Sequence, residues 1–381
     1  MIFVYCCIII GLITIGVNVY LLAGLSQIKR LNAQPLMQNG PSLDIIIAVR
    51  NEENDLEKAL QSVCNIHYKN CRIIVVNDRS TDGTAGILAR FARQFPQIKI
   101  VTISTLPDKW LGKNNALYQG YLNSDAEWML FTDADVVFHP DALNKALDYA
   151  LNNQLDHLTV TVLPEIASRS SLLNSVLATF SVMLCLHIKP WNARKPGLKG
   201  YAGVGAFNLL RRDAYEKIGT HAAIKLRPDD DLQLGLAIKK AGLHQDVLFG
   251  IGCVSLEWYR SLKEFGNGVT KNSFSVLDYS LPKVIFSVIS IMVSITLPMP
   301  LMFIFGPGYI REIATVVLSS HIVYMIATPP NKWWYALMIP FAGLCMAWII
   351  LRAAILNTRQ GGIYWRDSFY SLDMLKGKTE V

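Results

Sequence analysis

DIIIAVRNEENDLEKALQSVCNIHYKNCRIIVVNDRSTDGT, residues 44–84, is the stretch that decides the fold. Residues 44–49 and 72–76 are short, continuous apolar runs rich in β-branched side chains, which is typical of buried parallel strands. Between them, residues 54–64 repeat their apolar side chains at helical spacing. The stretch therefore predicts a strand–helix–strand unit.

The same alternation continues along the chain. Further strands are predicted at residues 98–103 and 128–132, and further helices at residues 84–95 and 112–121. Strands that alternate with helices at this spacing predict an α/β domain with a doubly wound, mostly parallel sheet. Beyond residue 140 the pattern loosens.

Two later segments are predicted separately. The charge-free residues 171–188 form either an interfacial helix at a membrane or a buried helix of the same domain. The glycine-rich residues 200–208 (GYAGVGAFN) do not fit a phosphate-binding fingerprint. We expect them to provide a tight backbone passage beneath the site.

Polar side chains follow three of the four predicted strands. Arg50 and Glu52 come after the first strand, Asp78 after the second, and Asp133 and Asp135 after the fourth. Open α/β sheets bind ligands outside the carboxyl ends of their strands. Arg50, Glu52, Asp78 and Asp133 are therefore predicted to bind substrate at that edge of the sheet, with Asp135 beside them.

The aspartates also point to a metal. Asp133 and Asp135 can direct one carboxylate to a sugar hydroxyl and the other to Mg²⁺ or Mn²⁺, which would neutralise a departing diphosphate. Lys113, near a predicted helix start, is a candidate phosphate ligand. These residues therefore predict a metal-assisted site for a phosphate-containing substrate.

A third acidic cluster lies further along the chain. Asp229, Asp230 and Asp231 open an amphipathic helix, and three acids exceed what helix capping needs. Like charges this close raise one another's pKa. This suits a general base that takes a proton from an acceptor hydroxyl.

Hydropathy predicts a membrane protein. Of the 381 residues, charged residues make up only 17%, against about 25% in typical soluble domains. About 20 apolar residues span a bilayer core. The charge-free stretches that reach or approach this length are residues 1–28, 284–310, 313–331 and 333–351.

The first stretch is interpreted as a retained anchor. A signal peptide is the alternative, but no basic residue precedes the apolar run and no cleavage site is evident. Lys29 and Arg30 follow directly and favour the cytosolic side, which places the catalytic domain in the cytosol. The net charge of +7 suits an anionic bilayer, phosphate-rich substrates or plain positive-inside bias, and nothing further supports nucleic-acid binding.

These boundaries predict five segments. They are an N-terminal transmembrane anchor at 1–28, a linker at 29–42, a catalytic domain at 43–279, transmembrane or re-entrant helices at 280–356 and an interfacial tail at 357–381.

The quoted motifs resemble a known family. IIIAVRNEE (45–53), VVNDRSTDGT (75–84), FTDADVVF (131–138) and DDDLQLG (229–235) are similar to elements of the inverting family 2 glycosyltransferases with the GT-A, Rossmann-like fold. The resemblance covers roughly residues 43–275.

The resemblance implies a role for each matched residue. Asp78 would hold the nucleoside, Asp133 the ribose or diphosphate and Asp135 the divalent metal. Asp231 would be the catalytic base, with Asp230 the second choice. The mechanism implied is a single in-line displacement in which the acceptor oxygen attacks the anomeric carbon.

One departure bears on the acceptor. Processive synthases of the family carry Gln-x-x-Arg-Trp after the base, whereas this chain reads EWYRSL at 257–262, with Arg260 a candidate diphosphate ligand. The arrangement resembles ceramide glucosyltransferases and bacterial hopanoid- and carotenoid-associated members. It implies non-processive transfer from a UDP-sugar to a lipid, in the inner membrane of a bacterium.

Three alternatives remain open. The enzyme alternatives are a polysaccharide synthase and a polyprenyl-phosphate glycosyltransferase. The third is an inactive, nucleotide-binding membrane scaffold.

The number of C-terminal spans conflicts with the charge of the tail. Three spans after a cytosolic domain would place the tail outside, yet the tail carries Arg359, Arg366, Lys376 and Lys378. Because Pro298 and Pro300 interrupt the stretch 284–310, we expect a re-entrant hairpin there.

Overall fold

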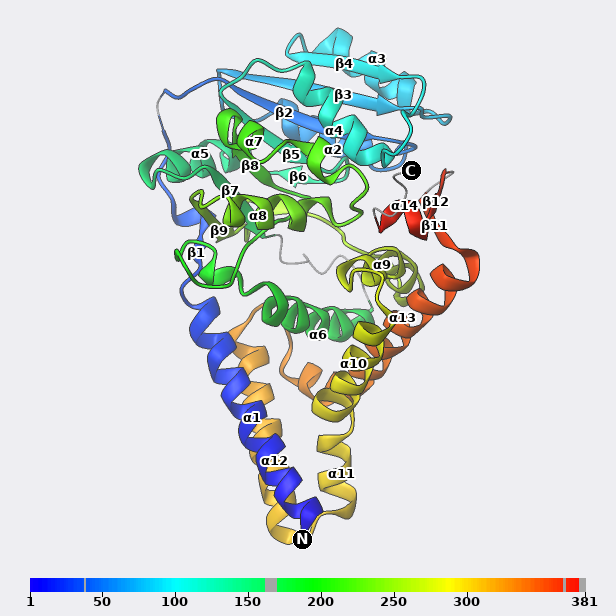
Figure 1. Ribbon diagram of the computed structural model, residues 1–381. Coiled ribbons are helices and arrows are strands. Elements are labelled where there is room, and N and C mark those ends of the chain that lie inside the picture. Colours follow the sequence, from blue (N-terminus) through cyan, green and yellow to red (C-terminus); the bar gives the residue numbers. More distant parts are fainter. Residues whose placement is uncertain (38, 162–169, 366–367, 377–381) are drawn as a thin grey trace. The chain divides into compact units, whose positions relative to one another are not determined.

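The computed structural model describes residues 1–37, 39–161, 170–365 and 368–376. The chain divides into two compact units. The sheet unit comprises Ile28–Glu165 and Ile188–Glu257, and the helical unit comprises Met1–Gln27, Ile166–His187 and Trp258–Val381. The predicted fold class is confirmed, because a mostly parallel sheet with covering helices is accompanied by long apolar helices toward both ends of the chain (Figure 1).

An eight-stranded sheet forms the centre of the sheet unit. Its order is β1-β9-β7-β8-β5-β2-β3-β4, and β8 alone among these strands runs antiparallel to its neighbours. The strands are β1 (Lys29–Arg30), β2 (Leu43–Val49), β3 (Cys71–Asp78), β4 (Ile98–Ile103), β5 (Trp128–Thr132), β7 (His157–Thr161), β8 (Asn208–Arg211) and β9 (Gln245–Phe249). A separate antiparallel pair joins β6 (Val137–Phe138) to β10 (Val254–Ser255). The four predicted strands are β2 to β5.

Both faces of the sheet are buried. Ile45 and Ile47 of β2 face the core formed with α2 (Leu56–Cys64), α3 (Thr84–Gln94) and α5 (Ala142–Asn152). Ile46 faces the opposite core, formed with α4 (Gly112–Leu122), α7 (Arg212–Lys217) and α8 (Asp230–Lys240). Successive strand residues point to opposite faces, so a strand covered on both sides is apolar throughout. Each such side chain contributes about 1.5–3 kcal/mol when fully buried.

The strands beyond residue 140 lack this signal. β7 buries His157 and Thr159, and β9 buries Gln245, so polar residues occupy interior positions there. These strands have four or five residues each, too few for a periodic pattern to stand out.

The predicted linker contributes to the sheet unit. Residues 29–42 contain β1 and η1 (Leu31–Ala33), and Leu31 is fully buried. The Asn144 side chain holds Met37, because its Oδ1 accepts from the Met37 N–H at 2.6 Å and its Nδ2 donates to the Met37 carbonyl at 3.0 Å.

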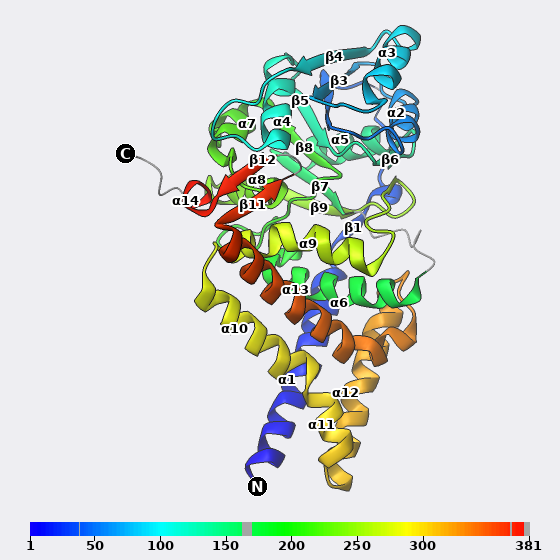
Figure 2. The ribbon, with the colours of Figure 1, turned by 90° about the vertical axis from the view of Figure 1, so that its right-hand side faces the viewer.

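The helical unit contains four helices long and apolar enough to cross a membrane, counted over the described residues. They are Ile2–Leu25, Ser171–Asn192, Gly308–Ala327 and Trp333–Gln360. The first is α1 (Ile2–Leu25), and the other three contain α6 (Ser171–Ile188), α12 (Gly308–Ala327) and α13 (Ile339–Gln360). In Figure 2, α1 and α12 run side by side.

The helix at 171–188 belongs to this unit. In α6, Leu173 and Val176 pack against Phe265 of α9 (Leu262–Val276) and Met346 of α13. The helix therefore packs with the C-terminal helices, which differs from the alternative of a buried helix within the sheet domain.

The stretch around Pro298, where a hairpin is expected, is a bent pair of helices. The segments Leu281–Thr296 and Pro298–Phe305 meet at a bend of 44°, and the chain continues in the same general direction through α10 (Leu281–Ile291) and α11 (Pro298–Phe305) (Figures 1 and 2). The bend falls at Leu297, between the π-helical turn η4 (Met292–Thr296) and Pro298. Pro298 starts α11, where a proline is tolerated. The chain reverses its direction between α11 and α12 (Figures 1 and 2).

The tail forms a small hairpin. β11 (Gly362–Trp365) pairs with β12 (Ser368–Ser371), followed by α14 (Leu372–Leu375). Tyr364 and Phe369 are exposed and contact each other, as an interfacial segment would require. Arg366 and Lys378, two of the four basic residues on which the predicted cytosolic side of the tail rests, lie outside the described residues.

Candidate active site

The polar residues that follow the strands meet at one edge of the sheet. β2 lies between β3 and β5, so the residues after these three strands are neighbours. The chain order of the strands reverses between β2 and β5, and ligands of open α/β sheets bind at such a switch point. The structure thus brings the three predicted strand-end groups together.

Asp78 is a buried carboxylate between two arginines. Arg79 donates to it from Nε at 2.7 Å and from Nη2 at 3.0 Å. Nη1 of Arg50 lies 3.5 Å from Asp78 Oδ2. This part of the site therefore holds one more positive than negative side chain, which favours an anionic group such as a phosphate.

The loop that carries Arg50 and Glu52 is tied to the loop after β3. The Glu52 N–H donates to Thr84 Oγ1 at 2.9 Å. Asn51 Oδ1 accepts a hydrogen bond from the Thr81 N–H at 2.8 Å. These bonds fix the two loops to each other, so Arg50 keeps a defined place beside Asp78.

Lys113 is the cation around which carboxylates from different elements gather. Its Nζ lies 2.8 Å from Asp133 Oδ1 and 3.5 Å from Asp230 Oδ1. Burial works against the ammonium charge, but the carboxylates of Asp133, Asp230 and Asp231 outweigh it and raise the pKa of Lys113 well above its ordinary value. Lys113 therefore stays protonated and links the strand-end acids to the acids of α8.

Asp135 stands in an excess of negative charge. Its side chain is exposed at the surface, yet neighbouring protein atoms desolvate the carboxyl group. Desolvation and the charges of Asp133 and Glu52 raise the pKa of Asp135 to about 7. A bound cation would relieve this repulsion.

The three acids of the Asp229–Asp231 cluster have different surroundings. Asp229 is buried and accepts hydrogen bonds from Arg227 Nε at 2.9 Å and Nη2 at 2.8 Å. Gln233 Nε2 donates to the same carboxylate at 2.7 Å. Asp229 is thus occupied in stabilising the start of α8.

Asp230 and Asp231 are held on the side of Lys113. Burial is the largest influence that raises the pKa of each carboxyl group, and the negative charge of Asp133 raises both further. The positive charge of Lys113 lowers both pKa values. Asp231 Oδ2 accepts a hydrogen bond from the Gly205 N–H at 2.9 Å. A carboxylate with a raised pKa and a fixed orientation can act as a general base.

The glycine-rich residues 200–208 provide the predicted tight passage. A Cβ on Gly203 would lie 1.9 Å from the Asp231 carbonyl oxygen, and one on Gly205 would lie 2.7 Å from Asp133 Oδ2. At position 203 only glycine permits the loop to run this close to the Asp231 backbone, whereas a Cβ at position 205 would displace the Asp133 side chain. That prediction is confirmed.

Arg260 belongs to the helical unit. It is exposed between β10 and α9, and its N–H donates to Glu264 at 2.8 Å. Its role toward the diphosphate stays a prediction.

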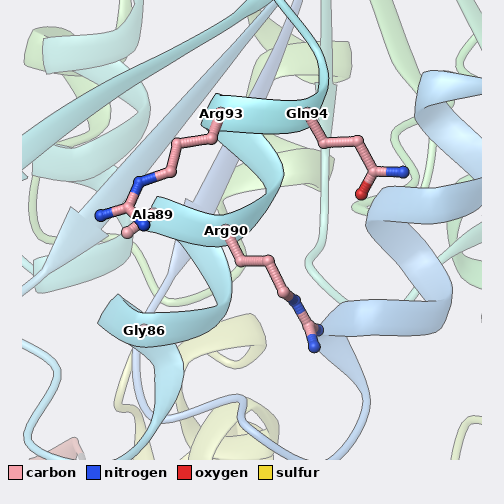
Figure 3. A pocket seen from close by; sticks show the side chains of 5 residues that line it. All are labelled: Gly86, Ala89, Arg90, Arg93 and Gln94. Carbon is pink, nitrogen blue, oxygen red and sulfur yellow. The ribbon is translucent and has the colours of Figure 1, made fainter.

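A pocket of about 460 Å³ lies along α3, lined by Gly86, Ala89, Arg90, Arg93 and Gln94. Figure 3 shows Arg90 and Arg93 extending to different sides of the helix, so they do not converge on one ligand. None of the predicted site residues lines this pocket.

The carboxylates fit a metal that shares its ligands with a substrate. Across the described residues, no three His, Cys, Asp or Glu side chains are grouped so that they could hold a metal ion alone. Mg²⁺ is commonly bound by one or two protein carboxylates and completed by water and substrate phosphates, and Mn²⁺ prefers the same oxygen ligands. Asp135 and Asp133 match that ligand set.

Sequence reasoning missed the residues that hold the acids in place. Arg227, Gln233 and Gln245 each fix a group of the site through side-chain hydrogen bonds. Arg227 could have been predicted from the sequence, since an arginine two residues before an acidic cluster is a common ion-pair partner. Gln245 gives no such signal, because its contacts are distant in sequence.

Comparison with known proteins finds a family model and several relatives that this chain resembles. Residues 44–219 match the family model described as "Glycosyl transferase family 2". The chain is 28% identical over 266 residues to a 4,4'-diaponeurosporenoate glycosyltransferase of Staphylococcus aureus strain bovine RF122 / ET3-1, covering 68% of each chain. It is 27% identical over 263 residues to the protein of the same name in strain USA300, again covering 68% of each.

A solved structure shares the fold across both units. The mannosyltransferase PcManGT from Pyrobaculum calidifontis, in complex with GDP-Man and Mn²⁺, matches with a TM-score of 0.54 and 15% identity. The match covers 96% of this chain and 99% of that one.

Proposed function

The chain belongs to the family 2 glycosyltransferases, and from this premise we propose that it transfers a sugar from a nucleoside-diphosphate sugar to a membrane lipid with inversion. The observation that carries the proposal is the grouping of Asp133, Asp230 and Asp231 around Lys113. Donor-side and acceptor-side carboxylates thereby share one site.

The donor is proposed to lie at the strand ends. Asp78, with Arg50 and Arg79 beside it, would accept hydrogen bonds from the nucleoside while the arginines face the diphosphate. Asp133 and Lys113 would contact the ribose or diphosphate. We expect a UDP-sugar from the family resemblance. Because the Pyrobaculum calidifontis structure contains GDP-Man, the assay must compare donors with different nucleosides.

Asp135 is proposed to hold Mg²⁺ or Mn²⁺. When bound, the metal supplies positive charge that stabilises the departing nucleoside diphosphate. Two observations favour this assignment: the crowding of negative charge around Asp135 and the presence of Mn²⁺ in the structure with the same fold.

Asp231 is proposed as the catalytic base, with Asp230 as the second choice. The acceptor oxygen would form a bond to the anomeric carbon as the bond to the diphosphate oxygen breaks, and its proton would pass to Asp231. Asp229 is the least suited of the three, because Arg227 and Gln233 already occupy its carboxylate. A single displacement of this kind inverts the configuration.

The acceptor is proposed to be a lipid with a hydroxyl or carboxyl group. Relatives named for diaponeurosporenoate favour a carotenoid-like or similar apolar acceptor. The chain lacks Gln-x-x-Arg-Trp, which favours single transfer over polymer extension. Arg260, beside the place of that missing motif, stays a candidate diphosphate ligand.

The chain is proposed to reside in the bacterial inner membrane with the sheet unit in the cytosol. Lys29 and Arg30 follow α1 directly and favour the cytosolic side. In the helical unit, the N-terminus and the connection between α11 and α12 lie at one end, and α13 ends at the other (Figures 1 and 2). If α1, α10–α11 and α12 are the spans and α13 does not cross the bilayer, the end of α13 lies on the cytosolic side, as the basic tail requires.

A transfer assay tests the proposal. Membranes that contain the wild type or Asp231→Asn would receive Mn²⁺, a lipid extract and radiolabelled nucleotide sugars, one at a time. Asp125→Asn is the matched control, because it changes an exposed aspartate outside the site. We expect label in the organic phase for the wild type and the control, and its loss for Asp231→Asn.

Other outcomes would contradict the proposal in distinct ways. Label in an insoluble polymer would identify a polysaccharide synthase, and label on an added polyprenyl phosphate would identify that acceptor class. If Asp231→Asn transferred as much label as the wild type, Asp231 would not be the catalytic base. Nucleotide binding without transfer from any donor to any added acceptor would favour the inactive scaffold.

A further inference from the structure

Gln245 connects the glycine-rich loop to α8. It is the first residue of β9 and is fully buried. Its Oε1 accepts a hydrogen bond from the Ala202 N–H at 3.0 Å, and its Nε2 donates to the Gly235 carbonyl at 2.8 Å. One partner is a donor and the other an acceptor, so together they fix the orientation of the amide.

The two groups that Gln245 holds lie where the loop and the helix are in closest contact. A Cβ on Gly235 would lie 1.9 Å from the Ala202 carbonyl oxygen. A Cβ on Gly203 would lie 1.9 Å from the Asp231 carbonyl oxygen. With backbone directly against backbone, a displacement of the loop also displaces the start of α8.

The loop 202–206 also contacts both sides of the site. The Gly205 N–H donates to Asp231 Oδ2 at 2.9 Å. Thr132 Oγ1 donates to the Ala206 carbonyl at 2.8 Å, directly before Asp133 in the chain. The loop therefore spans the gap between Asp133 and Asp231.

We propose that Gln245 is a positioning residue that fixes, through the loop 202–206, the place of the Asp231 carboxylate relative to Asp133. The inference rests on the proposed function, in which Asp231 is the base and Asp133 contacts the donor. Gln245 acts on the reaction only through the loop and α8. Its removal should therefore impair the chemical step more than donor binding.

Gln245→Met is the informative variant. Methionine has a similar length and volume but cannot make either hydrogen bond. Because small misplacements of a catalytic group can cost about a hundredfold in rate, we expect kcat to fall about ten- to a hundredfold with little change in the donor KM.

The pH profile provides a second readout. The hydrogen bond from the Gly205 N–H lowers the pKa of Asp231, so a looser loop should raise that pKa. The acidic limb of the kcat profile should then move to higher pH. The charged groups nearest to Asp231, which are Lys113, Asp230 and Asp133, are unchanged in the variant.

Asn144→Leu is the matched control. Asn144 makes the same pair of hydrogen bonds to the backbone of Met37, outside the site. The control should lower stability but leave the donor KM and the acidic limb of kcat as in the wild type. A merely structural role for Gln245 would give the same result as this control.

Hydrogen exchange of the full-length chain in detergent tests the connection without any reaction. In Gln245→Met, amide exchange should increase in both residues 201–207 and residues 229–236. In Asn144→Leu it should increase around residues 31–37 instead. Unchanged exchange at residues 201–207 and 229–236 in Gln245→Met would overturn the proposal.

The two failures are distinguishable. If the wild type transfers sugar and Gln245→Met retains its kcat and acidic limb, the positioning proposal is wrong while the function stands. If the wild type transfers no sugar from any donor, the proposed function fails, and the exchange result alone decides whether Gln245 holds the loop against α8.

Discussion

The ammonium group of Lys113 lies 2.8 Å from the carboxylate of Asp133. Lys113 stands in the first turn of α4 and Asp133 directly after β5, so this ion pair joins a helix start to a strand end. The same ammonium lies 3.5 Å from Asp230. One cation thus balances acids on the donor side and on the acceptor side.

Replacing Lys113 should therefore disable the site. Lys113→Met leaves Asp133, Asp230 and Asp231 without their shared cation, and it removes a candidate phosphate ligand. We expect kcat/KM to fall by about a hundredfold or more, as for other preorganised charges. Lys99→Met is the control, because Lys99 is exposed and donates a hydrogen bond to the Asn123 carbonyl, away from the three aspartates. Normal activity in Lys113→Met would contradict this role.

The acids Asp229 and Asp231 should respond differently to the same substitution. Asp231→Asn should lower kcat by about 10²–10⁴-fold and retain donor binding, because a base acts in the chemical step. Asp229→Asn should lower the free energy of unfolding by about 1–3 kcal/mol, because it breaks the ion pair with Arg227, whose side chain is 24% exposed. Thermal unfolding and single-turnover rates below the transition would separate the two effects.

Divalent-metal binding should weaken in acid. The pKa of Asp135 is raised to about 7, so below pH 7 its carboxyl group increasingly carries a proton that must leave before a metal can bind. For one released proton, the affinity for Mn²⁺ should fall about tenfold for each pH unit below 7 and level off above it. Titration of free Mn²⁺ at several pH values measures this. Asp135→Asn should bind weakly throughout, and a flat profile in the wild type would exclude this titration.

A polar contact between α1 and α12 should stabilise the helical unit. Asn18 is buried and donates to Ser320 Oγ at 2.9 Å, and it lies 3.0 Å from His321 Nδ1. Hydrogen bonds between membrane helices contribute about 0.6 kcal/mol on average and up to about 2 kcal/mol. Asn18→Leu should lower the free energy of unfolding in detergent by about that amount.

Thr14→Val is the matched control for the helix contact. The Thr14 hydroxyl bonds to the Ile10 carbonyl of its own helix, so its removal leaves the contact with α12 intact. Equal losses of stability in Asn18→Leu and Thr14→Val would show that the bond between the helices contributes little.

The sequence by itself determined the half of the sheet that carries the donor side of the site. β2 and β5, and β3 from Ile73 onward, are buried on both faces, so each contains a continuous apolar run with a polar residue at or directly after its end. Chain order alone then places Arg50, Asp78 and Asp133 at one edge, because parallel strands end on the same side. The same local logic identified the apolar helices.

Only the tertiary structure decided how the remaining groups are used. Asp229, Asp230 and Asp231 are identical in type and adjacent in sequence, and their surroundings alone separate them: Arg227 occupies Asp229, while Lys113 faces Asp230. The contacts of Gln245 join residues 43 and 10 positions away, and no local pattern encodes such pairs. Periodicity reports which side of an element is buried, whereas partners distant in the chain are chosen by packing, which exists only in the folded protein.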